Sequence, residues 1–150
     1  MKGKSPIKYF FLIGLAVIAA ILTGCSTQKN TAQSRWWHAF NARYNTYYNG
    51  TVAYIDGALE KEEGNRDNFT EQIPLYTVGN RNSRDLGKAN FDRAIEKCEK
   101  AIHQHSIKRR PIVKGNKRKS PKMKAYLSRK EFNPFLKNAW LLMGKAQFQK

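Results

Sequence analysis

The sequence predicts an all-α fold in which an export signal precedes the N-terminal part of a helical repeat array. Apolar residues recur at steps of three and four over residues 37–58 and again over 91–105, which is the period of an amphipathic helix. A third periodic stretch follows the Asn-Pro pair at 133–134, a capping residue with proline at the first helical position. These three stretches carry the prediction of fold class.

The first 24 residues have the three-part layout of a bacterial export signal. A start with three lysines and no acid precedes an apolar run from Tyr9 to Leu22, and small residues follow that run. The run is 14 residues long, shorter than the roughly 20 residues that a membrane-spanning helix needs. A cleaved signal peptide over residues 1–24 is therefore favoured over the alternative, an uncleaved spanning helix.

The segment Leu22-Thr23-Gly24-Cys25 resembles the lipobox of bacterial lipoproteins. This resemblance implies that Cys25 is acylated and becomes the first mature residue, with residues 25–34 as a polar tether. No acidic residue follows Cys25 directly, which favours the periplasmic face of the outer membrane. Such a location excludes functions that need ATP, chromosomal DNA or the ribosome.

Residues 35–64 are expected to form an amphipathic helix capped by Ser34. Its predicted packed stripe consists of the residues at steps of three and four: Trp37, Phe40, Tyr44, Tyr47, Thr51, Tyr54 and Ala58. The pair Asn49-Gly50 is a turn signal, so two antiparallel helices that meet there are the alternative. One continuous helix ending at Gly64 is favoured.

This helix is rich in aromatic and amide side chains. The candidate partner-binding residues on it are Trp37, Asn41, Tyr44, Asn45 and Tyr48. Rings supply contact area and amides supply hydrogen bonds, so this surface can bind a peptide or a glycan. The alternative, which is favoured, is a helix–helix seam in which neighbouring residues satisfy the polar atoms.

An extended loop is expected at about residues 65–85, because Pro74 interrupts a short apolar stretch. Its apolar side chains, Ile73, Leu75 and Tyr76, are predicted to cover the flank of the helices. The second helix is expected over 86–106, so that residues 35–106 form one repeat-like region.

The second helix carries Phe91, Ala94, Cys98 and Ala101 on one stripe, which resembles the second helix of a tetratricopeptide repeat, although phenylalanine is usual where Cys98 stands. Cys98 is interpreted as a small buried hydrophobe in preference to an intermolecular disulfide partner. His103 and His105 point to different sides of a helix, so no metal site and no cofactor are expected.

The final segment, 133–150, is interpreted as the first helix of a truncated repeat. The spacing Trp140-x2-Met143-Gly144 resembles the opening helix of a tetratricopeptide repeat, in which the glycine permits close approach by the next helix. The interval from Ala94 to Trp140 is about 28 residues longer than a repeat of roughly 34 residues allows. We therefore expect residues 107–132 to be an inserted loop with no helical period.

The formal charge of +17 is concentrated in that inserted loop. Removing the signal peptide leaves +14, and 11 lysines and arginines lie between Ile107 and Lys130 without one acid. The exported location and the lack of interleaved aromatic residues argue against nucleic-acid binding. Contact with lipid phosphates, docking on an acidic partner and a merely solvated loop remain open. The candidate binding residues are Lys108, Arg109, Arg110, Lys117, Arg118 and Lys119.

The chain as a whole resembles the PorW or SprE family of type IX secretion lipoproteins of Bacteroidetes. The resemblance rests on these segments: 22–25, 44–50, 73–76, 96–98 with 105–111, and 127–148. It implies an N-terminal fragment of a longer, non-catalytic scaffold that binds envelope proteins of a secretion and gliding motility apparatus. The alternative is a cell-envelope glycan or lipid-phosphate binding lipoprotein, and an enzyme is disfavoured because no nucleophile–base pair appears.

Overall fold

The computed structural model describes residues 12–14, 29–73, 75–78, 81–113, 115 and 120–150. Regular structure in these residues is entirely helical, which confirms the predicted all-α class. Most of the predicted signal peptide, together with Cys25, lies outside the described residues. Within the described part of the chain, no helix has the length and apolar character needed to cross a bilayer.

A single long helix runs from residue 32 to residue 64. It consists of α2 (Ala32–Asn41), a π-helical segment (Ala42–Tyr47) and α3 (Tyr48–Gly64). The prediction of one continuous helix is therefore confirmed. The predicted cap was wrong, because Thr31 occupies that position and its Oγ1 accepts a hydrogen bond from the Ser34 backbone N–H at 3.1 Å.

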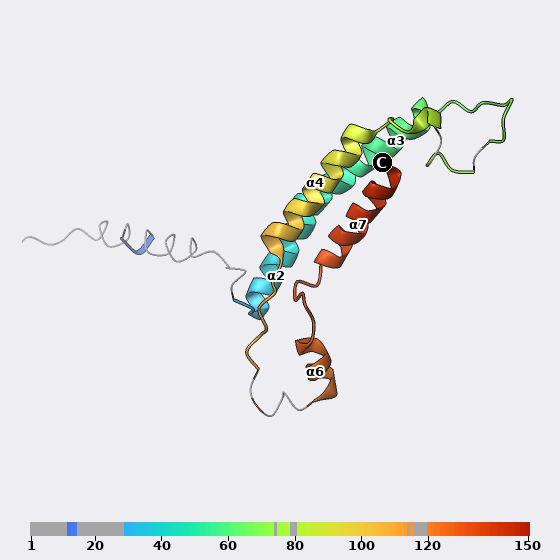
Figure 1. Ribbon diagram of the computed structural model, residues 1–150. Coiled ribbons are helices and arrows are strands. Elements are labelled where there is room, and N and C mark those ends of the chain that lie inside the picture. Colours follow the sequence, from blue (N-terminus) through green and yellow to red (C-terminus); the bar gives the residue numbers. More distant parts are fainter. Residues whose placement is uncertain (1–11, 15–28, 74, 79–80, 114, 116–119) are drawn as a thin grey trace, which may run out of the picture.

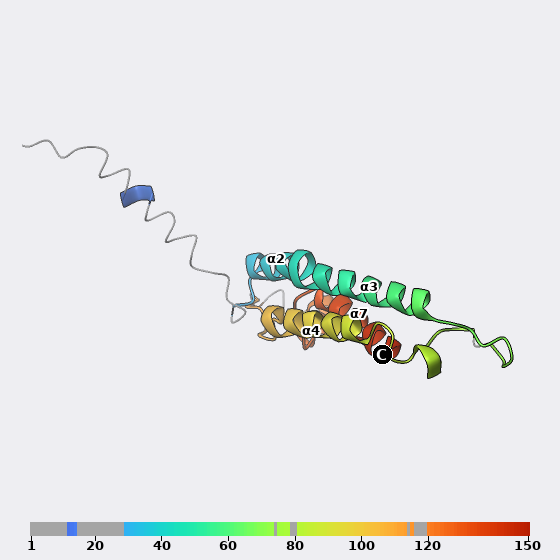
Figure 2. The ribbon, with the colours of Figure 1, turned by 90° about the horizontal axis from the view of Figure 1, so that it is seen from above.

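Two further helices pack beside this rod. Helix α4 (Lys88–His105) returns antiparallel to α3, and α7 (Leu136–Gln149) runs back along both of them (Figures 1 and 2). The chain therefore forms an elongated three-helix layer in which α4 contacts both partners. The loop after α3 lies at one end of the layer, and residue 29 lies at the other (Figure 1).

The core lies where α4 meets its neighbours. The predicted stripe of Phe91, Ala94, Cys98 and Ala101 is confirmed, because all four residues are fully buried. Burying an aromatic side chain as large as Phe91 contributes roughly 1.5–3 kcal/mol. Helix α7 supplies a matching row of buried residues, namely Leu136, Ala139, Leu142 and Ala146.

Helices α3 and α4 approach closely because both present small residues at their contact. A Cβ atom added to Gly57 lies only 3.1 Å from Cε1 of Phe91, and one added to Gly50 lies 3.5 Å from Sγ of Cys98. Gly87, just before α4, adopts a φ of 71° and sits against the Gly57 carbonyl, a position that only glycine occupies without strain.

The predicted packed stripe of the long helix was wrong. The buried face consists instead of small and polar residues: Ser34, His38, Ala42, Thr46, Gly50, Ala53, Gly57 and Lys61. From 34 to 50 these residues recur every fourth position, and an α-helix of about 3.6 residues per turn carries such a row gradually around its axis. The wider turns of the π segment offset this drift and keep the row facing α4. Of the predicted stripe, the later residues Tyr47, Thr51, Tyr54 and Ala58 are half-buried, whereas Trp37, Phe40 and Tyr44 are exposed.

The loop over residues 65–85 does not cover the helices. Ile73, Leu75 and Tyr76 are exposed, Leu75 with 87% of its surface in solvent. The loop instead projects from the end of the layer (Figure 1). Leu86, which follows the loop, supplies the apolar contact at that end, because its side chain lies against Gly64.

Two predicted boundaries near the C-terminus need correction. Residues 107–132 are not wholly irregular, because α6 (Pro121–Leu127) begins with proline at its first position. Helix α7 starts at Leu136 and not at 133–134. Asn133 still accepts a hydrogen bond from the Phe135 N–H, while its own amide donates to the carbonyl of His105 and so ties the chain back to α4.

Candidate functional site

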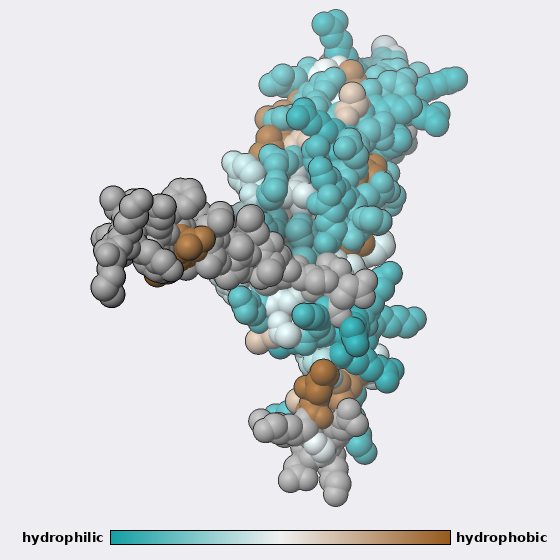
Figure 3. Space-filling model, turned by 90° about the vertical axis from the view of Figure 1, so that its left-hand side faces the viewer, coloured by the Kyte–Doolittle hydropathy of each residue, from teal (hydrophilic) through white to brown (hydrophobic). Residues whose placement is uncertain are grey.

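The long helix carries an exposed apolar surface on the side away from its buried face. We call this surface the aromatic face, and its members are Trp36, Trp37, Phe40, Tyr44, Tyr48, Val52, Ile55 and Leu59. Figure 3 shows apolar residues reaching the surface over α3. A continuous exposed apolar row of this length is typical of a site that binds another molecule.

The rings of the aromatic face are ordered by contact with each other. The Trp36 and Phe40 rings stack with centroids 5.5 Å apart, and the Phe40 and Tyr44 rings lie 4.8 Å apart. The Arg43 guanidinium lies 5.1 Å from the centre of the Tyr44 ring, within the range of a cation–π interaction. These three rings are therefore a preorganised ladder that loses little side-chain entropy on binding.

Three of the predicted binding residues are aromatic members of this face. Trp37, Tyr44 and Tyr48 expose 45%, 58% and 61% of their surface. The favoured interpretation of these rings, a seam between helices of this chain, was therefore wrong. The chain's own seam is filled by small residues, and that leaves the rings outside it.

Of the two predicted amide residues, Asn41 donates a hydrogen bond to its own helix. The Asn41 amide donates to the Trp37 carbonyl at 2.9 Å, and the Asn49 amide donates to the Asn45 carbonyl at 2.8 Å. Asn45 itself is exposed beside these contacts. Side-chain donors of this kind satisfy carbonyls where the helix widens into its π segment. Asn41 thus supports the rings, and Asn45 remains available to a ligand.

The second predicted surface is the basic tract, the cationic part of the inserted loop between Ile107 and Lys130. Its described residues near α2 lie at the end of the layer where α2 begins. A pocket of about 620 Å³ opens there between the start of α2, residues 109–113 and α6. We call this region the basic end. Its described lining contains four cations and no acid, and its wall includes Ile112, Val113, Met123 and Tyr126; the cations are Lys29, Arg35, Arg109 and Arg110.

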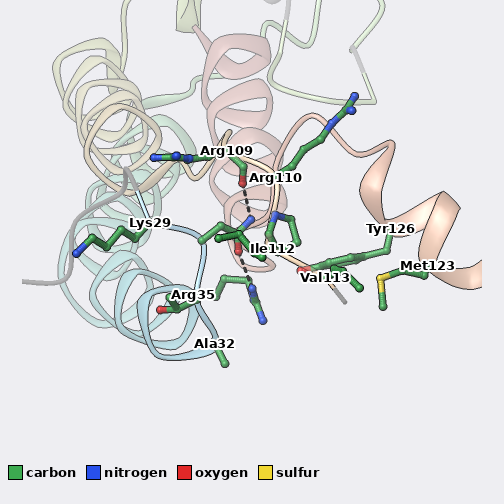
Figure 4. Close-up of a pocket in the computed structure, with 12 residues that line it drawn as sticks. Lys29, Ala32, Arg35, Arg109, Arg110, Ile112, Val113, Met123 and Tyr126 are labelled. Carbon is green, nitrogen blue, oxygen red and sulfur yellow. Dashed lines mark hydrogen bonds between the residues drawn. The ribbon is translucent and has the colours of Figure 1, made fainter. Parts of the chain in front are cut away.

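Hydrogen bonds join the two sides of the basic end. The Asn30 amide donates to the Arg109 carbonyl and its Oδ1 accepts from the Arg35 guanidinium, both at 2.6 Å (dashed lines in Figure 4). Lys108, Arg109 and Arg110 are exposed, as predicted for binding residues. The predicted residues Lys117, Arg118 and Lys119 lie outside the described part of the chain.

A single carboxylate joins the two ends of the basic tract. Glu131 accepts hydrogen bonds from the backbone N–H groups of Ile107, Phe132 and Asn133, and from the Ser106 hydroxyl. Ile107 is fully buried at this point. Glu131 therefore joins the two ends of the tract, and sequence reasoning missed it because its main partners lie 24 and 25 residues away along the chain.

Helix α7 presents another exposed apolar surface that the sequence only partly indicated. Trp140, Leu141 and Phe148 are exposed, and Trp140 lines a pocket of about 920 Å³ beside α4. A Cβ atom on Gly144 meets nothing within 4 Å, so the close approach predicted for this glycine involves no described residue of this chain. In a repeat array, a following helix is expected at this position.

The buried titratable groups have structural roles. Burial, and next the charge of Glu99, raise the pKa of the Cys98 thiol to about 11, so the thiol stays protonated, in agreement with its predicted role as a buried hydrophobe. His105 lies with its Nδ1 atom 3.1 Å from Nδ1 of His38, and burial lowers its pKa. No group of three potential metal ligands occurs among the described residues.

Comparisons of the chain with protein-family models and with curated proteins found no match.

Proposed function

We propose that the chain is a non-catalytic scaffold that is lipid-anchored at Cys25 to the periplasmic face of the outer membrane. In this proposal it serves a type IX secretion and gliding apparatus, as its resemblance to the PorW or SprE family implies. Its partners are envelope proteins of that apparatus. The chain is an N-terminal segment of a tetratricopeptide-like array that binds them through helix surfaces.

The observation that carries the proposal is the aromatic face. Exposed rings at a regular helical spacing, held in place by their own stacking, offer a partner large contact area at low entropic cost. Arg43 and Asn45 lie beside the rings and supply hydrogen-bond donors. This composition suits an apolar face of a protein partner rimmed by carbonyl or carboxylate groups.

The anchor is tested by mass spectrometry of the protein isolated from membranes. The expected N-terminal peptide begins at an acylated Cys25, and the Cys25→Ser chain keeps an unmodified N-terminus. An unprocessed Met1 terminus in the cytosol contradicts the proposed anchor.

The scaffold is tested by capture of envelope proteins on the immobilised chain. Secretion-system proteins identified by their peptides are the expected result, and binding is expected to fall when Tyr44 and Tyr48 are replaced by alanine. Recovery of peptidoglycan or lipopolysaccharide alone, lost at high salt, contradicts the scaffold and favours the glycan or lipid-phosphate alternative.

A further inference from the structure

The cations of the basic end diverge. Figure 4 shows the Lys29 ammonium and the Arg109 guanidinium on one side of the pocket, whereas the Arg110 guanidinium points to the opposite side. Side chains that diverge cannot close together on one small anion. They can each contact a different phosphate when many phosphates lie in one plane, as they do on a bilayer surface.

An apolar projection lies between these cations. Ile112 exposes 98% of its surface, although Arg109, Arg110 and Pro111 directly precede it. Figure 3 shows an apolar patch at the level of α6 and the loop before it. Apolar residues surrounded by lysine and arginine are typical of protein segments that lie in the interface of an anionic membrane.

The tether length places this end at a membrane if Cys25 is lipidated, so this step rests on the proposed function. Lys29 lies only four positions after Cys25. A fully extended chain of that length spans at most about 14 Å, however it runs. An acylated Cys25 therefore holds the pocket within reach of the headgroups.

We propose that the basic end is a docking surface for the anionic headgroups of a phospholipid bilayer. Ile112 enters the interface, and the surrounding cations contact separate lipid phosphates. Because the loop over residues 65–85 lies at the opposite end of the layer, docking directs the helices away from the bilayer (Figure 1). The aromatic face then extends outward, where a protein partner can reach it.

The test uses residues 25–150 with Cys25→Ser, so that neither acylation nor the apolar run from Tyr9 to Leu22 contributes to binding. Sedimentation measures partitioning onto vesicles of phosphatidylglycerol and phosphatidylcholine, compared with phosphatidylcholine alone. We expect at least a tenfold preference for the anionic vesicles. Each cation at such a surface is worth about a fivefold factor, so the pair Arg109→Gln and Arg110→Gln is expected to lower binding more than about tenfold.

Matched controls lie at the other end of the molecule. Arg81→Gln with Arg84→Gln removes the same charge there and is expected to leave partitioning within about twofold, since that end does not face the vesicle. Replacing Arg109 and Arg110 by lysine keeps the charge and is expected to preserve binding. Ile112→Gln is expected to weaken binding several-fold, whereas Leu75→Gln, at a highly exposed apolar position of the opposite end, leaves it unchanged.

Three outcomes overturn the docking surface. The first is equal partitioning onto neutral and anionic vesicles. The second is an equal loss in the two glutamine pairs, which indicates a response to net charge alone. The third is full displacement by a few millimolar inorganic phosphate, which indicates a small-anion site. An unacylated Cys25 in cells, with vesicle binding as expected, contradicts the anchor but not the docking surface.

Discussion

The two faces of the long helix differ in the size of their side chains, and this difference decides what each face binds. The inner face has Ala42, Gly50 and Gly57, whose small size lets the backbones of α3 and α4 approach each other. The outer face carries rings such as Tyr44 and Tyr48, which have a larger contact area but remain exposed. In this chain the helices pack most closely where the side chains are small, and the large rings stay exposed and can contact another molecule.

The largest effect is expected from placing a large side chain on the inner face. Gly57→Leu inserts its atoms against Phe91 and Asn90 and is expected to lower the free energy of unfolding by about 3 kcal/mol. Val52→Leu, a change on the exposed face, is expected to alter it by less than about 0.5 kcal/mol. Urea unfolding followed by circular dichroism measures both. Equal stability of the two variants contradicts the close seam.

The reactivity of Cys98 gives a second measure of how tightly the inner seam is closed. A rise of the thiol pKa from 9.0 to about 11 lowers the thiolate fraction at pH 8 about a hundredfold. Alkylation of Cys98 in the Cys25→Ser chain is therefore expected to be at least that much slower than in urea-unfolded chain at the same pH. Comparable rates in folded and unfolded protein indicate an open seam.

The outer face is expected to affect binding without affecting folding. Tyr44→Ala with Tyr48→Ala is expected to weaken partner binding about tenfold or more, because truncated central rings lose contact area that nothing replaces. Its free energy of unfolding is expected to change by less than about 1 kcal/mol. The control Leu75→Ala with Tyr76→Ala removes two side chains of the distal loop that are even more exposed. Surface plasmon resonance that finds the same loss in both pairs contradicts a specific aromatic face.

The smallest effect is a dependence of stability on pH. The pKa of His105 is lowered in the fold by burial and next by His38, so the unfolded chain binds more protons between the lowered pKa and the ordinary value near 6.5. The free energy of unfolding is therefore expected to fall as pH decreases below about 6.5. His105→Gln is expected to reduce this dependence, whereas His103→Gln, at an exposed position, leaves it unchanged. A slope that persists in His105→Gln contradicts this assignment.

Sequence periodicity predicted the helices better than it predicted their faces. The stripe of Phe91, Ala94, Cys98 and Ala101 was predicted correctly. Helix α4 lies between two helices, so its apolar side is buried against them. On the long helix, the period was traced through the rings, because aromatic side chains were counted as the packed residues and glycine, serine and histidine were passed over. The signal that identifies the buried face is the row of small residues at every fourth position, which matches the small residues of α4.

The candidate surfaces could be predicted only in part. The sequence indicated Trp37, Tyr44 and Tyr48, and it located the basic tract, since composition alone reveals both. It could not place Asn30 against Arg109, which lie 79 residues apart in the chain. The pocket of the basic end depends on that contact and on the hydrogen bonds that Glu131 accepts from Ser106 and Ile107. Long-range contacts of this kind arise from packing and leave no local pattern.

Photo-crosslinking in living cells tests the partner-binding role of the aromatic face most directly. A benzophenone amino acid at position 44 is expected to crosslink the full-length protein to an envelope protein of the secretion apparatus. The same group at position 93, an exposed position on α4, is expected to give far less of that product. Equal crosslinking from both positions, or products with cytosolic proteins only, contradicts a periplasmic scaffold that binds through this face.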